Sequence, residues 1–414
     1  MRQIDVLIVG GGQAGLAMSR CLADEGIEHV VLERGRIAER WRSERWDSLR
    51  LLTPNWQARL PGWSYAGPDP DGFMSSAELV RYLEQYAHSF SAPVEYGVSV
   101  TSVTAVTRGF QVTTTQGTWL ARRVVVASGE CGHAHVPRIA RGLSEDIFQI
   151  VPTRYRNPSQ LPDGGVLVVG ASATGIQLAS EIHASGRPVT VAVGRHTRLP
   201  RQYRGRDILW WLDRMGLLTE RAEDVWSLEV ARQQPSLQLV GTPEGHTVDV
   251  GLLHAQGVRF VGRSIGAMGH RMAFDDDLVE NTVAADMKLA RLRLRIDTHI
   301  ASDDDLADVQ EAQPLRTTPL LDSPETLDLR AEGVRTVLWA TGYRRSYPWL
   351  KVPVLDERGE IRHRRGVTCT PGLYALGLRF QTRRNSNFID GVGADARELT
   401  EHILAMRRRT ALAS

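Results

Sequence analysis

The chain has 414 residues, enough for two or three domains with complete hydrophobic cores. Hydrophobic residues make up 42%, charged residues 24%, and the formal net charge is +2, which argues against a disordered chain and against a nucleic-acid partner. The three cysteines are far apart and form no CxxC pair, so we expect no metal site and no vicinal redox disulfide. No stretch of about 18 apolar residues occurs, so we expect a cytoplasmic protein without a membrane span.

The N-terminal residues predict a strand–helix–strand unit. Residues 4–9 contain a continuous apolar run, which is typical of a buried parallel strand. Residues 13–24 predict a helix that Gly26 closes, and residues 29–32 predict a second strand that ends at Glu33.

The next segment is irregular and Trp-rich as far as residue 65. Ser75 and Glu78 have the spacing of a capping box, which predicts a helix that begins there and runs to about His88. Residues 94–126 alternate between apolar and polar side chains and contain two glycine turns, which predicts a small antiparallel β-meander.

A second strand–helix–strand unit follows a boundary turn at residues 161–165. Its strands are predicted at 166–169 and 188–193, with a helix at 175–184 between them. The pattern after this unit predicts a helical stretch over 206–234.

The last part of the chain predicts an apolar strand over 334–340, a short strand over 373–376 and a closing helix over 394–409. Strands typical of the first unit return after about residue 340. We therefore expect an α/β fold in which one Rossmann-like domain is inserted into another, together with the β-meander.

The turn after the first strand carries the spacing GxGxxG. Gly10 permits the tight turn, Gly12 lets a pyrophosphate approach the backbone, and Gly15 lets the helix pack on the strand. The helix N-terminus offers free N–H groups to phosphates. Glu33 would accept hydrogen bonds from ribose hydroxyls and repel a 2′-phosphate, so this turn suits FAD or NAD and not NADP.

The turn of the second unit has Gly170 and Gly175 in the outer positions and Ser172 in place of the middle glycine. Arg195 follows the second strand, where the first unit has an acid, and its guanidinium matches a 2′-phosphate. This favours NADPH over NADH, although Arg195 can also be read as a solvated loop residue. Arg198 lies close by in the sequence, and weaker alternatives for the same role are Arg201 and Arg204.

Two dinucleotide sites in one chain point to electron transfer from a nicotinamide to a flavin. We expect a discontinuous FAD-binding domain over 1–160 and 331–414. The NADPH-binding domain is expected over 161–330, with a helical cap or insert at about 200–300.

These motifs, together with Ala340-Thr341-Gly342-Tyr343 and Gly372-Leu373-Tyr374-Ala375-Leu376-Gly377, resemble the flavin-containing monooxygenase family of two-dinucleotide-binding-domain flavoproteins. The resemblance covers nearly the whole chain. It implies that Thr341 and Gly342 lie in the linker between the nucleotide domains. It also implies that a helix beginning near Asp390 and Ala394 faces the pyrimidine edge of the flavin.

The chain departs from the family at its fingerprint FxGxxxHxxx(Y/F/W). Phe148 and Tyr155 occupy the two ends of the corresponding segment. Ile150 stands where the family has glycine, and Val151 or Pro152 falls where it has histidine. This departure puts the oxygen chemistry in doubt.

The resemblance implies a single-component monooxygenase that uses FAD, NADPH and O2. It would oxygenate a small nucleophilic nitrogen, sulfur or electron-rich aromatic substrate through a C4a-hydroperoxyflavin. Asn55 is the expected catalytic residue, and an ordinary turn is the alternative reading. Further cofactor contacts are expected at Gln13, Ala14, Arg34, Trp41 and Thr174.

Three alternative functions stay open. The chain could be an NADPH-dependent flavoprotein reductase or oxidase that oxygenates nothing, a flavin-dependent halogenase, or a nucleotide sensor without activity. The oligomeric state is also open, with a homodimer as one alternative.

Overall fold

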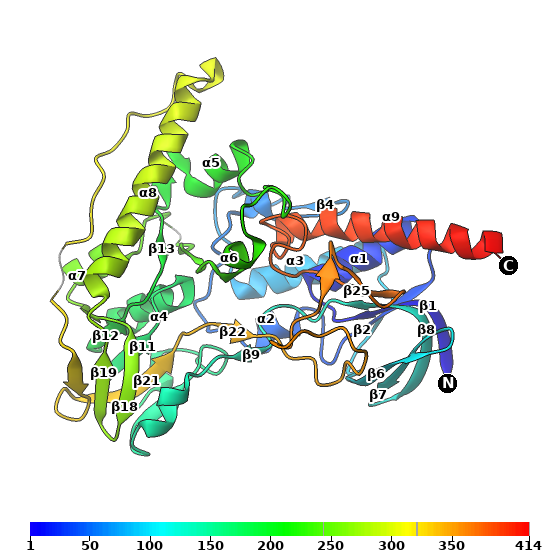
Figure 1. Ribbon diagram of the computed structural model, residues 1–414. Coiled ribbons are helices and arrows are strands. Elements are labelled where there is room, and N and C mark those ends of the chain that lie inside the picture. The colour runs from blue at the N-terminus through cyan, green and yellow to red at the C-terminus, as the bar shows by residue number, and fades with distance from the viewer. Residues whose placement is uncertain (243, 320–321, 414) are drawn as a thin grey trace.

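The chain forms two lobes, each built on its own sheet (Figure 1). The computed structural model describes residues 1–242, 244–319 and 322–413. Helix α9 (Ile389–Ala413) runs along the first lobe, and helix α8 (Leu278–Ala301) lies at the outer side of the second. None of the helices in these ranges is both long and apolar enough to cross a membrane.

The first lobe contains a mostly parallel sheet with the predicted meander attached. In spatial order the strands are β23 (His363–Arg364), β24 (Val367–Thr368), β25 (Leu373–Ala375), β8 (Gly117–Val126), β1 (Arg2–Val9), β2 (His29–Leu32) and β5 (Val94–Glu95). The sheet is parallel from β25 to β5 and antiparallel at β23 and β24. The antiparallel strands β6 (Val100–Val106) and β7 (Gly109–Thr114) join β8 and form the meander. The three strands β25, β8 and β1 are parallel neighbours, so residues 340–414 return to the sheet of the first unit as expected.

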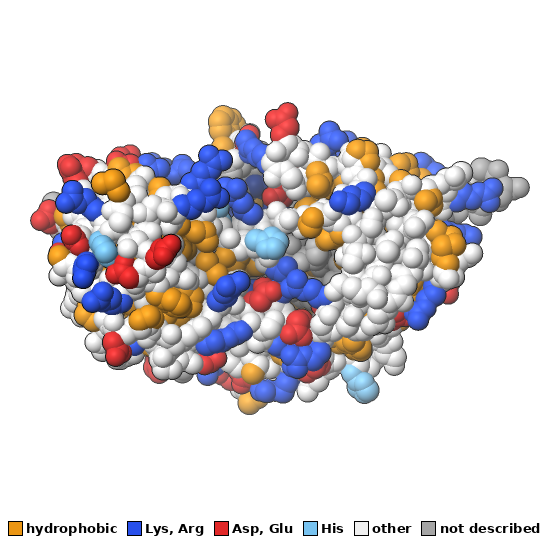
Figure 2. Space-filling model, turned by 90° about the horizontal axis from the view of Figure 1, so that it is seen from below, with side chains coloured by type: hydrophobic (Ala, Val, Ile, Leu, Met, Phe, Trp, Pro, Cys, Tyr) orange, Lys and Arg blue, Asp and Glu red, His pale blue; other side chains and the backbone are white. Residues whose placement is uncertain are grey.

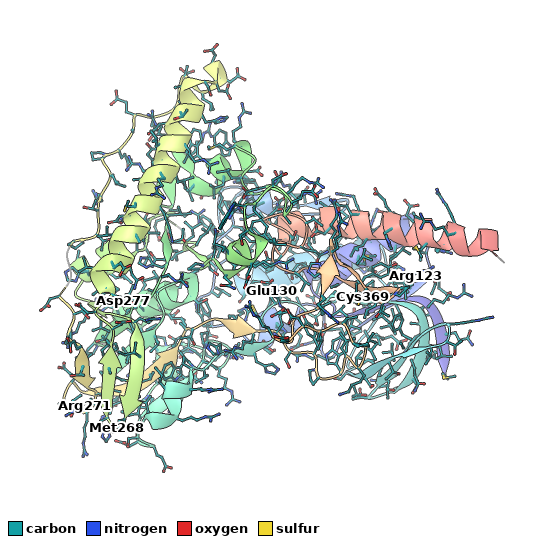
Figure 3. The ribbon with its side chains drawn as sticks, in the orientation of Figure 1. Arg123, Glu130, Met268, Arg271, Asp277 and Cys369 are labelled. Atoms are coloured by element: carbon teal, nitrogen blue, oxygen red, sulfur yellow. The ribbon has the colours of Figure 1, made fainter. Side chains whose placement is uncertain are left out.

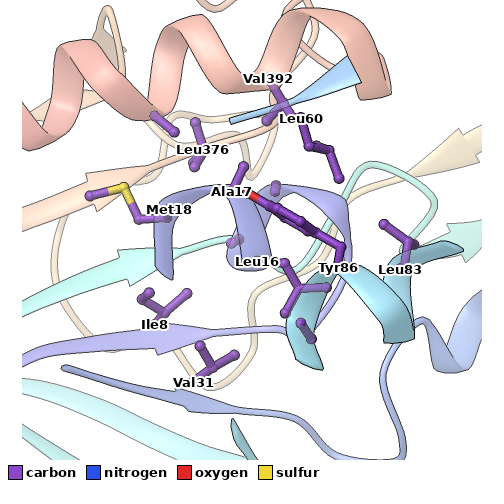
Figure 4. Close-up of a cluster of buried hydrophobic side chains, with 14 of the residues drawn as sticks. Ile8, Leu16, Ala17, Met18, Val31, Leu60, Leu83, Tyr86, Leu376 and Val392 are labelled. Atoms are coloured by element: carbon purple, nitrogen blue, oxygen red, sulfur yellow. The ribbon is translucent and has the colours of Figure 1, made fainter. Parts of the chain in front are cut away.

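Helices α1 (Gln13–Asp24), α3 (Ser76–Ser89) and α9 pack together on this sheet. Figure 4 shows the apolar core between them, with Ile8 and Val31 from the strands, Leu16 from α1, Tyr86 from α3 and Val392 from α9. Burial of a large apolar side chain stabilises the fold by about 1.5–3 kcal/mol. The capping box at the start of α3 is present, which confirms that prediction.

The second lobe contains a five-stranded parallel sheet. In spatial order its strands are β10 (Phe148–Ile150), β21 (Val334–Trp339), β11 (Gly165–Val169), β12 (Val189–Ala192) and β17 (Arg259–Val261). Helix α4 (Ala173–Ala184) follows β11, as predicted. Strands β10 and β21 lie outside the expected domain limits of 161 and 330. They belong to this lobe because β21 pairs in parallel with both β10 and β11.

The region 200–300 is less helical than the sequence suggested. Only α5 (Ile208–Arg214) and α6 (Leu228–Gln233) fall within 206–234, and Gly216 with φ +68° follows the first of them. Helix α7 (Val250–Ala255) and α8 come next, with the small antiparallel sheet β18 (Ser264–Met268), β19 (Arg271–Phe274) and β20 (Thr326–Asp328). The predicted helix over 206–234 is therefore wrong in its extent.

Candidate functional site

The first glycine turn requires glycine at two positions, at Gly10 because of its backbone conformation and at Gly15 because of a close backbone contact. Gly10 has φ +113°, and a Cβ on it would lie 2.6 Å from the carbonyl oxygen of Ala127. A Cβ on Gly15 would lie 1.8 Å from the carbonyl oxygen of Gly10. The turn, the start of α1 and the end of β8 are thus held in close contact.

Gly12 differs from both of these positions, because a Cβ on it would meet no atom within 4 Å. The backbone N–H groups of residues 12–15 have no hydrogen-bond partner in the described part of the chain. Four unpaired N–H groups at a helix N-terminus, beside open space, form an anion-binding cradle.

Glu33 is 8% exposed at the end of β2. Its Oε2 accepts a hydrogen bond of 2.7 Å from the N–H of Gly11, and its Oε1 accepts one of 3.0 Å from the N–H of Gly35. The carboxylate is therefore fixed beside the turn, with lone pairs left for further donors.

The second glycine turn repeats the geometry of the first. Gly170 has φ +112°, and a Cβ on it would lie 2.5 Å from the carbonyl oxygen of Ala340. A Cβ on Gly175 would lie 1.7 Å from the carbonyl oxygen of Gly170. The segment at Ala340 therefore crosses the second turn as the segment at Ala127 crosses the first.

The N-terminus of α4 is a second cradle. The backbone N–H groups of residues 171–175 have no partner among the described residues. Ser172 is the N-cap, and its hydroxyl makes no capping bond to the helix. Both the backbone and this hydroxyl are free to bind phosphate oxygens.

Only one of the four arginines proposed for a 2′-phosphate is free. Arg195 is exposed after β12, and no described residue forms an ion pair or a hydrogen bond with its side chain. Arg198 is buried between the carboxylates of Asp249 and Asp286. The other two are also paired with carboxylates: Arg201 with Asp207 and Arg204 with Asp297.

The two lobes are joined by two crossing segments that pair with each other. Strand β9 (His133–Ala134) is antiparallel to β22 (Tyr343–Arg344). The hydroxyl of Thr341 donates to the carbonyl oxygen of His135, and the N–H of His135 donates to the carbonyl oxygen of Gly342 at 2.8 Å. Thr341 and Gly342 thus lie at this crossing.

Glu130 lies on the first crossing segment, at the junction of the lobes (Figure 3). Burial raises the pKa of its carboxyl group, while Arg345, at 2.8 Å, opposes that shift. Figure 2 shows basic and acidic side chains intermixed across the waist between the lobes.

The expected catalytic residue Asn55 is held by the backbone on both sides. Its Nδ2 donates to the carbonyl oxygen of Asp69 at 2.8 Å, and its Oδ1 accepts from the N–H of Met74 at 2.8 Å. This arrangement stabilises the loop, and it leaves one Nδ2 hydrogen for a bound molecule.

Asn55 also lines a pocket of about 1030 Å³ between the β3–β4 hairpin (Arg59–Leu60 and Trp63–Ser64) and α3. Aromatic side chains form much of its wall: Trp63, Tyr65, Phe73 and Tyr82. The pocket reaches α9 through Arg59, which lines it and pairs with Asp390 at 2.6 Å. The start of α9 and the aromatic pocket therefore adjoin each other.

Three other predicted contacts lie in the first lobe. Trp41 packs against the cores of both lobes and stacks with Arg45, whose guanidinium carbon is 4.9 Å from the ring centroid. Arg34 is exposed and pairs with Glu44 at 2.9 Å. Ala394 is half-buried in the second turn of α9.

The segment that corresponds to the family fingerprint has a structural role in this chain. Phe148 lies in β10 and is 39% exposed. Tyr155 is fully buried, and its hydroxyl donates to Oε1 of Glu181 on α4 at 3.1 Å. Ser48 donates to the same carboxylate from the first lobe, so the segment helps to join the lobes.

Sequence reasoning missed two features. The crossing segment 127–129 closes over the first turn, and its small residues Ala127, Ser128 and Gly129 parallel those at 340–342. Asp395 is buried on α9 beside Thr382 and Arg383, and burial raises its pKa to about 6. The repeated pattern Ala-Ser/Thr-Gly was the available signal for the first feature.

The arrangement thus contains two helix N-termini with unpaired N–H groups, one beside the carboxylate of Glu33 and one followed along the chain by the free guanidinium of Arg195. Within the described ranges, no group of three or more His, Cys, Asp and Glu side chains is placed to hold a metal ion.

Comparison with known proteins agrees with this geometry. The model of the pyridine nucleotide-disulphide oxidoreductase family matches residues 7–212. An uncharacterized CzcO-like oxidoreductase of Geobacillus kaustophilus is 34% identical over 404 residues, which is 97% of this chain and 98% of that protein.

Two further relatives are monooxygenases by name. The probable indole-3-pyruvate monooxygenase YUCCA9 of Arabidopsis thaliana is 30% identical over 234 residues, 51% of this chain and 55% of that protein. The flavin-containing monooxygenase of Stenotrophomonas maltophilia shares the fold, with a TM-score of 0.67 and 21% identity over 98% of this chain and 99% of that one. The chain therefore belongs to the family of the CzcO-like oxidoreductase, its relative over nearly the full length, and it is similar to the plant monooxygenase over about half of its own length.

Proposed function

We propose that the first lobe binds FAD, that the second binds NADPH, and that the chain is a single-component monooxygenase for a small nucleophilic substrate. The observation that carries this proposal is the pair of glycine turns with nearly equal φ angles and opposite charges near them, Glu33 at the first and Arg195 at the second. The monooxygenase names of the relatives support the oxygenation step.

Each cradle has a defined part. The N–H groups of residues 12–15 would bind the FAD pyrophosphate, and Glu33 would accept from the adenosine ribose. The N–H groups of residues 171–175 and the Ser172 hydroxyl would bind the NADPH pyrophosphate, while Arg195 would donate to the 2′-phosphate. When bound, the two cofactors supply hydride transfer and activation of O2.

The remaining predicted contacts stay proposals. In the first lobe and its crossing segment these are Gly10, Gln13, Ala14, Gly15, Arg34, Trp41, Thr341, Gly342, Asp390 and Ala394, and in the second lobe Gly170, Thr174 and Gly175. The aromatic pocket beside Asn55 is the proposed substrate chamber, because it adjoins the start of α9 and its aromatic walls suit an apolar substrate.

The test is an anaerobic titration of the FAD-loaded protein with NADPH and with NADH, followed by ¹⁸O₂ and a panel of amines, sulfides and indoles. We expect NADPH to bleach the flavin at lower concentration than NADH, and ¹⁸O to appear in one product class by mass spectrometry. A protein that binds no flavin overturns the proposal.

One observation favours a second candidate, an NADPH-dependent flavoprotein reductase or oxidase. The fingerprint segment has Val151 and Pro152 where the flavin-containing monooxygenases have histidine, and the Tyr155 hydroxyl donates its hydrogen bond to Glu181. In that case the same titration bleaches the flavin, and all oxygen is recovered as hydrogen peroxide.

A further inference from the structure

Helix α8 carries apolar side chains on the face that points away from the second lobe. Its inner face buries residues such as Leu278, Ala285, Leu289 and Ile296. The outer face exposes four large apolar side chains: Val279 by 42%, Val283 by 45%, Met287 by 52% and Leu294 by 67%. Their spacing of four, four and seven residues places them in one stripe along the helix.

This stripe is an unusual concentration of exposed apolar surface for a folded chain. Scattered apolar residues on a surface need no explanation, but a contiguous stripe marks an interaction site. The 24 residues of α8 span about 36 Å, which is long enough for a helix pair. Figure 1 shows α8 at the edge of the molecule, where another chain can approach it.

The charged side chains beside the stripe identify the partner. Glu280 lies in the first turn, between Val279 and Val283, and Lys288, Arg291 and Arg295 follow from the middle of the helix onward. All four are exposed, and none makes an ion pair or a side-chain hydrogen bond with another described residue. The helix is therefore acidic at its start and basic toward its end, with these charges unpaired in the single chain.

We propose that the α8 stripe is a two-fold interface with a second copy of this chain, in which the two α8 helices are antiparallel and cross at Met287. Glu280 and Leu294 are each seven residues from Met287, so Glu280 of one copy lies level with Leu294 of the other. That level is within one turn of the partner's Arg291 and Arg295. At 100° per residue Glu280 and Arg291 share one flank of the helix, so they meet across the axis.

The same geometry pairs the apolar residues. Val279 lies within one residue of the level of Leu294, Val283 within one residue of the level of Ala290, and Met287 meets its own copy. A parallel pair would instead set the basic half of one helix against the basic half of the other, which is repulsive. The charge pattern thus selects a second copy in antiparallel orientation. This inference does not depend on the proposed oxygenation.

A matched pair of substitutions tests it by sedimentation velocity of the full chain. Met287→Arg places a charge on the proposed axis and should weaken dimerisation at least tenfold. Met268→Arg makes the same change at the tip of the β18–β19 hairpin, where the Met268 side chain is 77% exposed. Figure 3 labels Met268 well away from Asp277, which precedes α8. Met268→Arg should leave the dimer unchanged. A monomeric wild-type protein at tens of micromolar, or a dimer that both variants leave intact, overturns the proposal.

Charge reversal tests the orientation. Glu280→Arg alone and Arg291→Glu alone should each weaken the dimer several-fold, whereas the double variant exchanges the charges and should restore it. Oxidation of Met287→Cys in a Cys369→Ser background should give a disulfide-linked dimer, while Val230→Cys on α6 should give none. A double variant that dimerises more weakly than either single variant contradicts the antiparallel pair. Absence of the Met287→Cys cross-link contradicts it as well.

Discussion

The Oε2 atom of Glu33 accepts a hydrogen bond of 2.7 Å from the N–H of Gly11, which lies inside the first glycine turn. The acid that is proposed to bind the ribose therefore also fixes the turn that is proposed to bind the pyrophosphate. One side chain thus contacts both halves of the proposed FAD site.

Glu33→Ala should accordingly weaken FAD binding by about 10- to 100-fold, because a hydrogen bond to a charged group contributes about 1.5–3 kcal/mol. FAD affinity of the apoprotein can be measured from the quenching of flavin fluorescence. Glu28→Ala changes a nearby exposed acid and should leave the affinity unaltered. Equal affinity of the Glu33 variant and the wild type would remove this residue from the site.

Gly12→Ala separates folding from cofactor binding. Gly12 has φ −90° and open space around its missing Cβ, so alanine fits the protein itself. The added methyl group would occupy the approach of the pyrophosphate. We expect an unchanged melting temperature for the apoprotein and loss of FAD binding.

Gly15→Ala is the contrasting variant. Its Cβ would lie 1.8 Å from the carbonyl oxygen of Gly10, so the fold itself should be lost or strongly destabilised. Circular dichroism measures both variants. Full FAD binding by Gly12→Ala would show that the pyrophosphate lies elsewhere.

Arg195→Ala should remove the preference for NADPH. Loss of one guanidinium–phosphate contact is expected to raise the KM for NADPH about tenfold or more and to leave the KM for NADH unchanged. Arg204→Ala is the control, since that arginine is paired with Asp297 at 2.8 Å. A preference lost in the Arg204 variant instead would reassign the 2′-phosphate contact.

Local chemistry explains what the sequence could predict. The glycine turns are encoded within six residues each, and the structure has both of them with nearly equal φ angles at Gly10 and Gly170. The start and end of α1 follow from equally short patterns, and the β-meander follows from the alternation and glycine turns of residues 94–126. The contact roles proposed for the turn residues stay predictions.

Long-range pairing explains what the sequence could not predict. Strands β10 and β21 belong to the second sheet because of partners far along the chain, and no local pattern specifies such partners. Arg198 is 51 residues from Asp249 and 88 from Asp286, so sequence alone could not tell this buried ion pair from the free Arg195. The exposed stripe on α8 also cannot be predicted from the sequence alone, because the sequence does not specify which face of that helix is buried.

Asn55→Ala tests whether this residue is catalytic or structural. The change leaves the N–H of Met74 and the carbonyl oxygen of Asp69 without their present partner, and each buried unpaired group costs about 1–3 kcal/mol. We expect a lower free energy of unfolding in urea. A catalytic role adds a fall in kcat in FAD-saturated protein at a temperature where the variant is folded, whereas a purely structural role leaves kcat unchanged there.

Asp395 should make the stability of the protein depend on pH. Burial raises its pKa from 3.8 to about 6, so the folded state holds this proton more tightly than the unfolded state does. The stabilising contribution is complete below pH 3.8 and is lost as the pH rises through 6. A difference of about two pKa units corresponds to at most about 3 kcal/mol.

Asp395→Asn stays neutral, so its free energy of unfolding should exceed that of the wild type at pH 8 and approach it at pH 4. Asp390→Asn, which alters the half-buried carboxylate paired with Arg59, should retain the pH dependence of the wild type between these values. Parallel stability curves for the wild type and Asp395→Asn would show that folding does not raise the pKa of this carboxyl group.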